Sequence, residues 1–146
     1  MVRKRMVTAQ EAATTCACRK VRMAARAVTR AYDRALRPTG LRSTQFTILA
    51  AASVAGGIPL GQLAKILGLE RTTLTRNLAT IERDGLIRVA RVDGRTRNVL
   101  LLPAGVARLK QALPFWDQAQ RALHRKLGEE GWSGMQNGLA RLAEVA

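Results

Sequence analysis

The sequence has few of the side chains that most enzyme and metal sites require. Its 146 residues include one histidine and two cysteines, and aromatic residues make up only 3%. This composition largely excludes His-based catalytic triads and His-rich or four-cysteine metal sites. It contains no phosphate-binding glycine loop or paired-acid motif. The histidine, His124, falls in a helical stretch and is expected at the surface. We therefore expect no enzyme, and no cofactor or metal.

Acidic residues are scarce relative to basic ones. The chain has 25 Lys and Arg against 10 Asp and Glu, which gives a formal net charge of +15. The excess is largest in residues 1–42, with 11 basic and 2 acidic side chains. So strong a charge attracts polyanions, of which DNA is the main intracellular example.

Long apolar runs are also missing. No stretch approaches the roughly 20 apolar residues that a membrane-spanning helix needs. The basic start of the chain is not followed by the apolar segment of a secretory signal. We expect a cytoplasmic protein with no membrane partner. In that reducing compartment Cys16 and Cys18 are expected as free thiols.

The first part of the chain is typical of helices. An alanine-rich pattern predicts a helix from about Thr8 to Arg37, ended by Pro38 to Gly40. Its length suggests an arm or an oligomerisation element. A second helix is predicted from Thr44 to about Ala55, with Ser43 as its N-cap.

The middle of the chain combines two short helices and a hairpin. Apolar residues at helical spacing predict one helix over residues 59–67 and another over 71–84, joined by a tight turn at Gly68. Two β-rich runs, 86–92 and 96–102, then flank Asp93-Gly94-Arg95, a strong hairpin signal. A helix-turn-helix followed by a two-stranded hairpin predicts a winged helix, and the fold class is mainly α with a small β-hairpin wing.

The last part is again helical. A long helix is predicted from Pro103, with a kink at Pro114. A final helix after Gly128 carries an apolar seam: Trp132, Met135, Leu139 and Leu142. Because the terminal helices have apolar stripes but no sheet to cover, we expect a homodimer. The expected parts are residues 1–42 and 103–146 for dimerisation and residues 43–102 for DNA binding.

The second helix of the motif carries donor-rich side chains near its N-terminus. With Leu74, Leu78 and Ile81 buried, the polar residues face outward: Arg71, Thr72, Thr73, Thr75, Arg76 and Asn77. Such a helix reads bases in the major groove. The alternative is a solvated helix face, but β-branched threonines are poor choices for an idle surface.

The hairpin turn projects a cation. Arg95 suits the negative potential of a narrow minor groove, and Asp93 is positioned to orient its guanidinium. An ordinary turn with a surface ion pair is the alternative. Arg97 is expected on the strand, near a phosphate or paired with an acid.

The chain resembles the MarR-type winged-helix transcriptional regulators over nearly its whole length. The similar segments are LRSTQFTIL (41–49), PLGQLAKILGL (59–69), RTTLTRNLATIERDGLI (71–87), DGRTR (93–97) and LLPAG (101–105). The resemblance implies a homodimer on a pseudo-palindromic operator, usually a repressor released by a small ligand or an oxidant. It places Thr73, Thr75, Arg76 and Arg95 at DNA-contacting positions. Glu70 stands where members often have Asp.

Arginines recur every four residues along the first helix at positions 22, 26, 30 and 34. This stripe has three interpretations: contact with phosphates that flank the operator, an anionic-inducer site involving Arg22, Arg26 and Arg30, or a solvated face.

Cys18 and Tyr32 share one face of that helix, and Cys16 lies about 200° round from Cys18, at roughly 100° per residue. The fourteen-residue separation is similar to the organic-hydroperoxide-sensing branch of the family, in which the cysteine is oxidised and a tyrosine hydrogen-bonds it. Arg22 stands where a second tyrosine is expected, and it would stabilise a thiolate. Cys18 as a small buried apolar residue is the alternative.

These patterns predict a sequence-specific transcriptional regulator, a repressor that binds operator DNA as a homodimer with half-sites about 10–10.5 bp apart. Its release would follow thiol oxidation or an aromatic carboxylate or phenol bound between the first helix and the winged helix. The alternative is a non-specific architectural DNA-binding protein.

Overall fold

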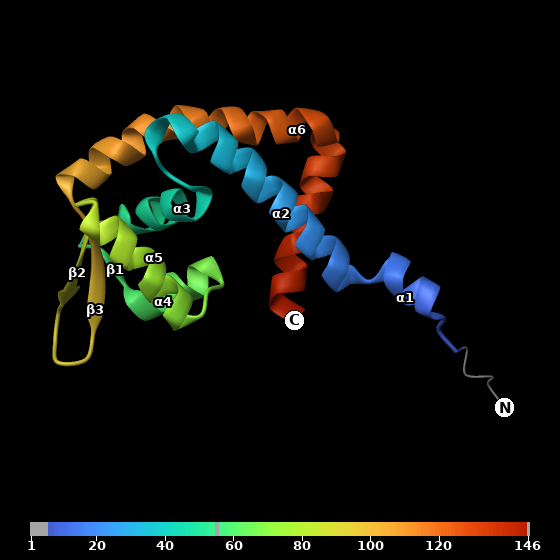
Figure 1. Ribbon diagram of the computed structural model, residues 1–146, viewed down its shortest axis with the longest axis horizontal. Coiled ribbons are helices and arrows are strands. Elements are labelled where there is room, and N and C mark those ends of the chain that lie inside the picture. Colours follow the sequence, from blue (N-terminus) through green and yellow to red (C-terminus); the bar gives the residue numbers. More distant parts are fainter. Residues whose placement is uncertain (1–5, 55, 146) are drawn as a thin grey trace.

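The computed structural model describes residues 6–54 and 56–145, and it is mainly helical (Figure 1). The bounds of its elements, in chain order, are α1 Ala9–Thr15, α2 Ala17–Leu36, η1 Arg37–Thr39, α3 Ser43–Ala52, β1 Ile58–Pro59, α4 Leu60–Leu67, α5 Arg71–Arg83, β2 Ile87–Arg91, β3 Arg97–Leu101 and α6 Pro103–Val145. The predicted winged helix is confirmed: α4 and α5 form the helix-turn-helix, and β2 and β3 form the wing.

The single first helix predicted from the sequence is wrong, because the backbone leaves the helical region at Cys16 (φ −57°, ψ 112°). The two residues before it bond back to their own helix. The Thr14 hydroxyl donates to the carbonyl oxygen of Gln10 at 2.9 Å, and the Thr15 hydroxyl donates to that of Glu11 at 2.6 Å. Such bonds compete with the helical ladder, so the chain breaks here into α1 and α2.

The start of α3 also differs from the prediction. Ser43 is its first helical residue rather than its N-cap, which is Arg42. The Ser43 backbone N–H donates to Asp33 Oδ1 at 2.7 Å. The carboxylate of Asp33 on α2 therefore supplies the acceptor that an N-cap side chain would otherwise provide. The helix ends at Ala52, three residues before the expected end.

The sheet has one strand more than the predicted hairpin. Its order is β1-β3-β2, all antiparallel, with Ile58 opposite Val99 and Val89 opposite Val99 from the other side. This third strand places the β1 segment, and hence the start of α4, directly against the wing. The helix-turn-helix and the wing are thus held in one unit.

The core of the molecule lies between α3, α4, α5 and the sheet. Its fully buried side chains include Ile48, Leu49, Leu63, Leu74, Ile81, Ile87 and Val99. The predicted inner face of α5 is confirmed, because Leu74, Leu78 and Ile81 are all buried. The opposite face of α5 is thereby turned toward solvent.

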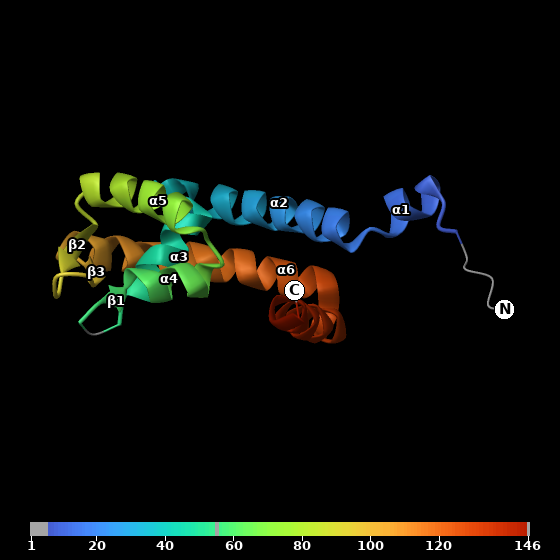
Figure 2. The same cartoon turned by 90° about the horizontal axis from the view of Figure 1, so that it is seen from below.

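The long helix α6 changes direction sharply at Gly128, after which the sequence predicted a final helix, and Pro114 lies inside the first half of α6. Gly128 has φ 71° and ψ 171°, and it is the position inside α6 with non-helical dihedrals. Glycine tolerates a positive φ that other residues rarely adopt. Figure 1 shows the two halves of α6 at a sharp angle, and Figure 2 shows that α2 and α5 lie along the same side of α6. No helix among the described residues is long and apolar enough to cross a membrane.

Candidate nucleic-acid interface

Helix α5, the second helix of the helix-turn-helix, is fixed from both ends. Gly68 ends α4 in the left-handed conformation (φ 61°), which allows the tight turn into α5. At the other end Glu82 Oε1 accepts a hydrogen bond of 2.8 Å from the Val89 N–H of β2. The helix therefore holds a set orientation relative to the wing.

Five of the six predicted contact residues of α5 are exposed: Arg71, Thr72, Thr73, Thr75 and Arg76. The sixth, Asn77, is half-buried, and its Nδ2 donates to the Thr73 carbonyl oxygen at 3.0 Å. Thr75 also donates its hydroxyl to its own helix, to the Arg71 carbonyl oxygen at 2.8 Å. Its methyl group and its hydroxyl oxygen remain available to a partner.

A groove of about 460 Å³ separates the first turns of α5 from the wing. Arg71 and Thr75 line it from α5, and Arg95 and Arg97 line it from the wing. The structure thus brings together four predicted residues that are up to 26 positions apart in the sequence. Three guanidinium groups around one groove favour an anion such as a DNA phosphate.

The turn of the wing is ordered by Asp93, but not in the predicted way. Asp93 Oδ1 accepts hydrogen bonds from the backbone N–H groups of Arg95 at 2.9 Å and Thr96 at 2.7 Å. Among the described residues it forms no ion pair with a guanidinium. The expectation that it orients the side chain of Arg95 is therefore wrong; it orients the backbone of the turn. These backbone bonds lower the pKa of the Asp93 carboxyl below its usual value.

The predicted sensor residues are not in contact within one chain. Cys16 and Cys18 are both exposed free thiols, and Arg22 Nη2 lies 3.3 Å from Cys18 Sγ. The Tyr32 hydroxyl instead donates to Gln120 Oε1 on α6. Burial raises the pKa of Tyr32. Fourteen residues of helix separate Tyr32 from Cys18 by about 21 Å.

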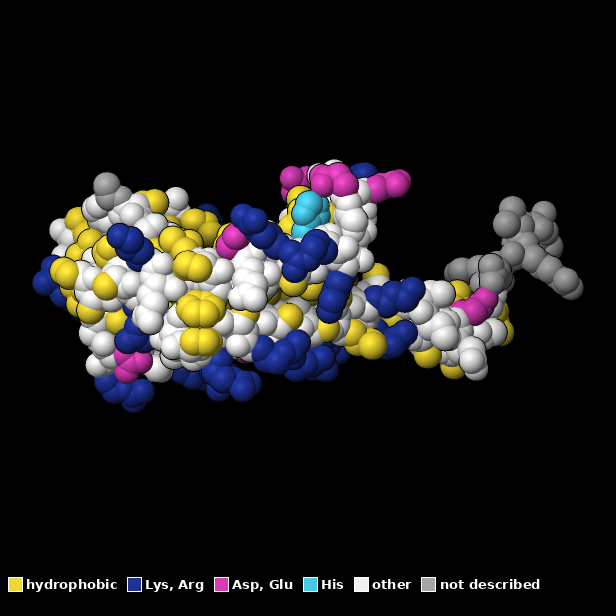
Figure 3. All heavy atoms as spheres, turned by 90° about the horizontal axis from the view of Figure 1, so that it is seen from above, with side chains coloured by type: hydrophobic (Ala, Val, Ile, Leu, Met, Phe, Trp, Pro, Cys, Tyr) yellow, Lys and Arg dark blue, Asp and Glu magenta, His cyan; other side chains and the backbone are white. Residues whose placement is uncertain are grey.

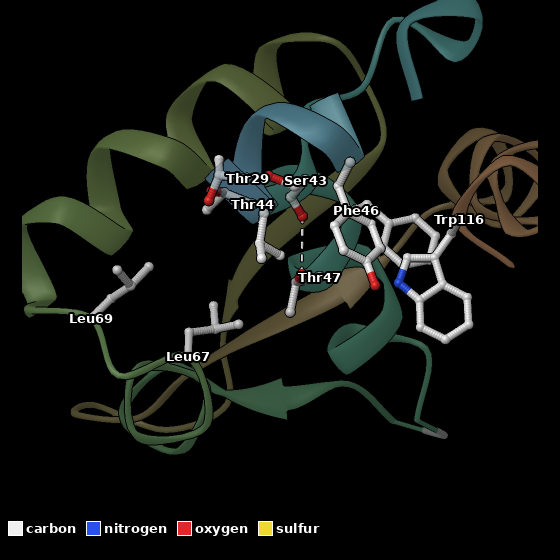
Figure 4. A pocket seen from close by; sticks show the side chains of 10 residues that line it. Thr29, Ser43, Thr44, Phe46, Thr47, Leu67, Leu69 and Trp116 are labelled. Carbon is white, nitrogen blue, oxygen red and sulfur yellow. Dashed lines mark hydrogen bonds between the residues drawn. The ribbon is translucent and has the colours of Figure 1, made fainter. Parts of the chain in front are cut away.

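A cavity of about 320 Å³ lies between α2 and the winged helix, where an inducer site was expected. Figure 4 shows Leu67 and Leu69 opposite the rings of Phe46 and Trp116, which stack with centroids 5.9 Å apart. The rest of the lining is Val28 and five residues with hydroxyl groups: Thr29, Tyr32, Ser43, Thr44 and Thr47.

The arginine stripe of α2, considered as a separate anionic-inducer site, does not line this cavity. Among the described residues, neither Arg22, Arg26 nor Arg30 lines the cavity between α2 and the winged helix. Arg30 lines a different cavity, at the junction of α2 and α3. The expectation of an anionic-inducer site involving Arg22, Arg26 and Arg30 therefore stays a prediction, separate from this cavity.

Fold and groove together define a winged-helix DNA-binding protein, and the comparisons with known proteins give its family. The family model described as MarR family matches residues 41–96. The DNA-bound crystal structure of the Mycobacterium tuberculosis transcriptional regulator MosR is 42% identical, with a TM-score of 0.81, over 88% of this chain and 94% of that one. The chain belongs to the MarR family.

Other solved structures share this fold. A probable transcriptional regulator from Pseudomonas aeruginosa is 25% identical, with a TM-score of 0.78, over 87% of this chain and 96% of that one. The regulator PcaV from Streptomyces coelicolor, solved with its natural ligand, is 18% identical with a TM-score of 0.82, over 96% and 99% of the two chains. A search of curated proteins finds no match.

Proposed function

We propose that this protein is a sequence-specific repressor that binds a pseudo-palindromic operator as a homodimer. The observation that carries the proposal is the groove where Arg71 and Thr75 of α5 meet Arg95 and Arg97 of the wing. In this arrangement α5 enters the major groove and Arg95 enters the adjacent minor groove. Arg76, exposed on the outer face of α5, reads a base edge.

The homodimer is supported by apolar side chains that one chain leaves uncovered. Beyond Gly128, Leu139 and Leu142 are 47% and 46% exposed, and Leu127 just before it is 45% exposed. Solvent-exposed leucines at helical spacing are typical of an oligomer interface. Two copies joined here would present two recognition helices to successive turns of one duplex.

Selection from a pool of random duplexes tests sequence specificity. We expect one enriched pseudo-palindrome with half-sites about 10–10.5 bp apart. Arg76→Ala and Arg95→Ala should each weaken binding to that duplex about tenfold or more. Arg125→Ala, an exposed charge loss on α6, is the matched control. Equal affinity for all duplexes would instead support a non-specific architectural protein.

Release of the DNA by a ligand is supported by the cavity between α2 and the winged helix, beside Phe46 and Trp116. Because its lining carries stacked rings and hydroxyl groups and, among the described residues, no cationic side chain, we propose a phenol rather than an aromatic carboxylate. Titration with phenol and with benzoate, followed by tryptophan fluorescence, separates the two. Thr47→Leu, which fills the cavity, should abolish the response to phenol.

Release by oxidation is supported by the 3.3 Å contact between Arg22 Nη2 and Cys18 Sγ. Cys18 is exposed, and an organic hydroperoxide would oxidise its thiol to a sulfenic acid while itself being reduced to an alcohol. Peroxide treatment should release DNA from the unmodified protein and not from Cys18→Ser. If both proteins keep their DNA after treatment, the sensor proposal is wrong.

A further inference from the structure

A second cavity, of about 480 Å³, lies at the junction where α2 continues through η1 into α3. Four arginines line it, together with one acid: Arg30, Arg34, Arg37, Arg42 and Asp33. The arginines come from three elements, because Arg30 and Arg34 belong to α2, Arg37 to η1 and Arg42 to the N-cap of α3. The path of the chain therefore gathers these guanidinium groups around one space.

Asp33, the acidic residue of this cavity, already accepts a hydrogen bond from the backbone. Asp33 Oδ1 accepts the Ser43 N–H at 2.7 Å, so the carboxylate is committed to the start of α3. Within the described part of the chain, none of the four arginines forms an ion pair. The lining therefore carries an excess of three positive charges that the fold does not neutralise.

The four arginines are all exposed, so the space is an open cationic recess that attracts an anion. Arg30 and Arg34 stand four residues apart on one helix, where like charges repel. Guanidinium groups match the oxygens of a phosphate with pairs of parallel hydrogen bonds. A phosphate ester carries about two negative charges at neutral pH, and a pyrophosphate group carries more.

We propose that this cavity binds a small molecule through a phosphate or pyrophosphate group. The proposal goes beyond DNA binding and does not depend on it. The lining contains no aromatic ring among the described residues, in contrast to the cavity beside Phe46 and Trp116. The two cavities therefore differ in chemistry, one cationic and one apolar with hydroxyl groups.

The position of the cavity favours a small molecule over the DNA backbone. Arg108 of α6 donates to the Thr39 carbonyl oxygen at 3.0 Å, which holds η1 against α6. Figure 1 shows this junction on the α6 side of the molecule, whereas the turn of the wing points the opposite way. In Figure 3 the basic side chains continue along one long edge, so charge alone does not distinguish the cavity from its surroundings.

The test uses two pairs of arginines on the same helix. Arg30→Gln with Arg34→Gln removes two charges from the cavity, and Arg22→Gln with Arg26→Gln removes two exposed charges at the same spacing outside it. Calorimetric titration of the full chain with inorganic pyrophosphate, at constant ionic strength, should show saturable binding. We expect the first pair to weaken it about tenfold or more and the control pair to weaken it less than about twofold.

Three results would overturn the proposal. One is the absence of saturable pyrophosphate binding, and another is equal weakening by both pairs, which would indicate general attraction to a basic surface. The third is a loss of duplex affinity caused by the cavity pair alone, which would assign the phosphates to DNA. Arg42→Gln is a second test, because it removes a cavity charge without changing α2. It should also weaken pyrophosphate binding, even if the Arg30→Gln, Arg34→Gln protein fails to fold.

Discussion

The winged-helix region and the terminal helices bury their apolar side chains in different ways. Residues 43–102 contain most of the core, and Leu74, Ile81 and Val99 are fully buried within one chain. In contrast, α1 has no buried residue, α2 has only Leu36, and the buried residues of α6 are Gly105, Ala112 and Ala119. The winged helix thus buries its core within one copy, whereas the terminal helices leave apolar side chains exposed in one copy.

The two regions also differ in charge. The wing and α5 carry separate arginines around a groove, whereas α2 carries them in a row. A groove lined by guanidinium groups from two elements imposes a geometry on its partner, whereas Arg22 and Arg26, the part of the row that lines neither cavity beside α2, do not. From this difference we expect sequence specificity to reside in the winged helix and the proposed dimerisation to reside in the terminal helices.

The largest effect, a change of oligomeric state, is expected from substitutions at the exposed leucines of the last part of α6. Leu139→Asp with Leu142→Asp places two charges in the uncovered seam, so we expect the dimer to dissociate. Light scattering after size-exclusion chromatography should show a monomer, with helical content largely retained. Val54→Asp, at a side chain 54% exposed outside the terminal helices, is the control and should stay dimeric. If the unmodified protein is a monomer, the proposed role of the terminal helices in dimerisation is wrong.

A smaller effect, on the free energy of unfolding, is expected at Gly105, where the start of α6 packs against the winged helix. A Cβ at Gly105 would overlap the carbonyl oxygen of Leu86 and lie 2.7 Å from Leu101 Cδ1. Gly105→Ala should therefore lower the free energy of unfolding by about 1–3 kcal/mol, measured by denaturant titration. Gly134→Ala, in the same helix with no atom within 4 Å, is the control. It should be neutral or stabilising, since alanine favours helices by about 1 kcal/mol over glycine.

The winged helix could be predicted from the sequence because its signals are local. Helical spacing of Leu74, Leu78 and Ile81, and the Asp93-Gly94 turn, each specify an element without reference to the rest of the chain. The third strand escaped prediction because Ile58 and Pro59 are too few to show a pattern. Only their pairing with Val99 and Asn98 makes them a strand.

The remaining errors arise from side-chain contacts that periodicity does not contain. The role of Asp33 as the acceptor at the start of α3 joins residues ten positions apart. Likewise, no pattern along α2 indicated that Tyr32 bonds Gln120, 88 positions away, within one chain; the sensor role of Cys18 stays a prediction. The arginine stripe gave no indication that Arg30 and Arg34 share a cavity with Arg42. Contacts of this kind depend on how helices pack, which spacing along one helix cannot specify.

The smallest effect is expected at the turn of the wing, and its sign follows from the pKa of Asp93. Two backbone N–H groups stabilise the carboxylate, so its folded pKa lies below the ordinary value of 3.8. A carboxyl of this kind stabilises the folded turn above its unfolded pKa, and the contribution is lost as pH falls through the folded pKa. NMR titration should therefore shift the amide signals of Arg95 and Thr96 with a midpoint below 3.8, while Asp93→Asn removes that transition. A midpoint at or above 3.8 would mean that Asp93 does not hold the turn, and the wing would then lack the local order that its part in specificity requires.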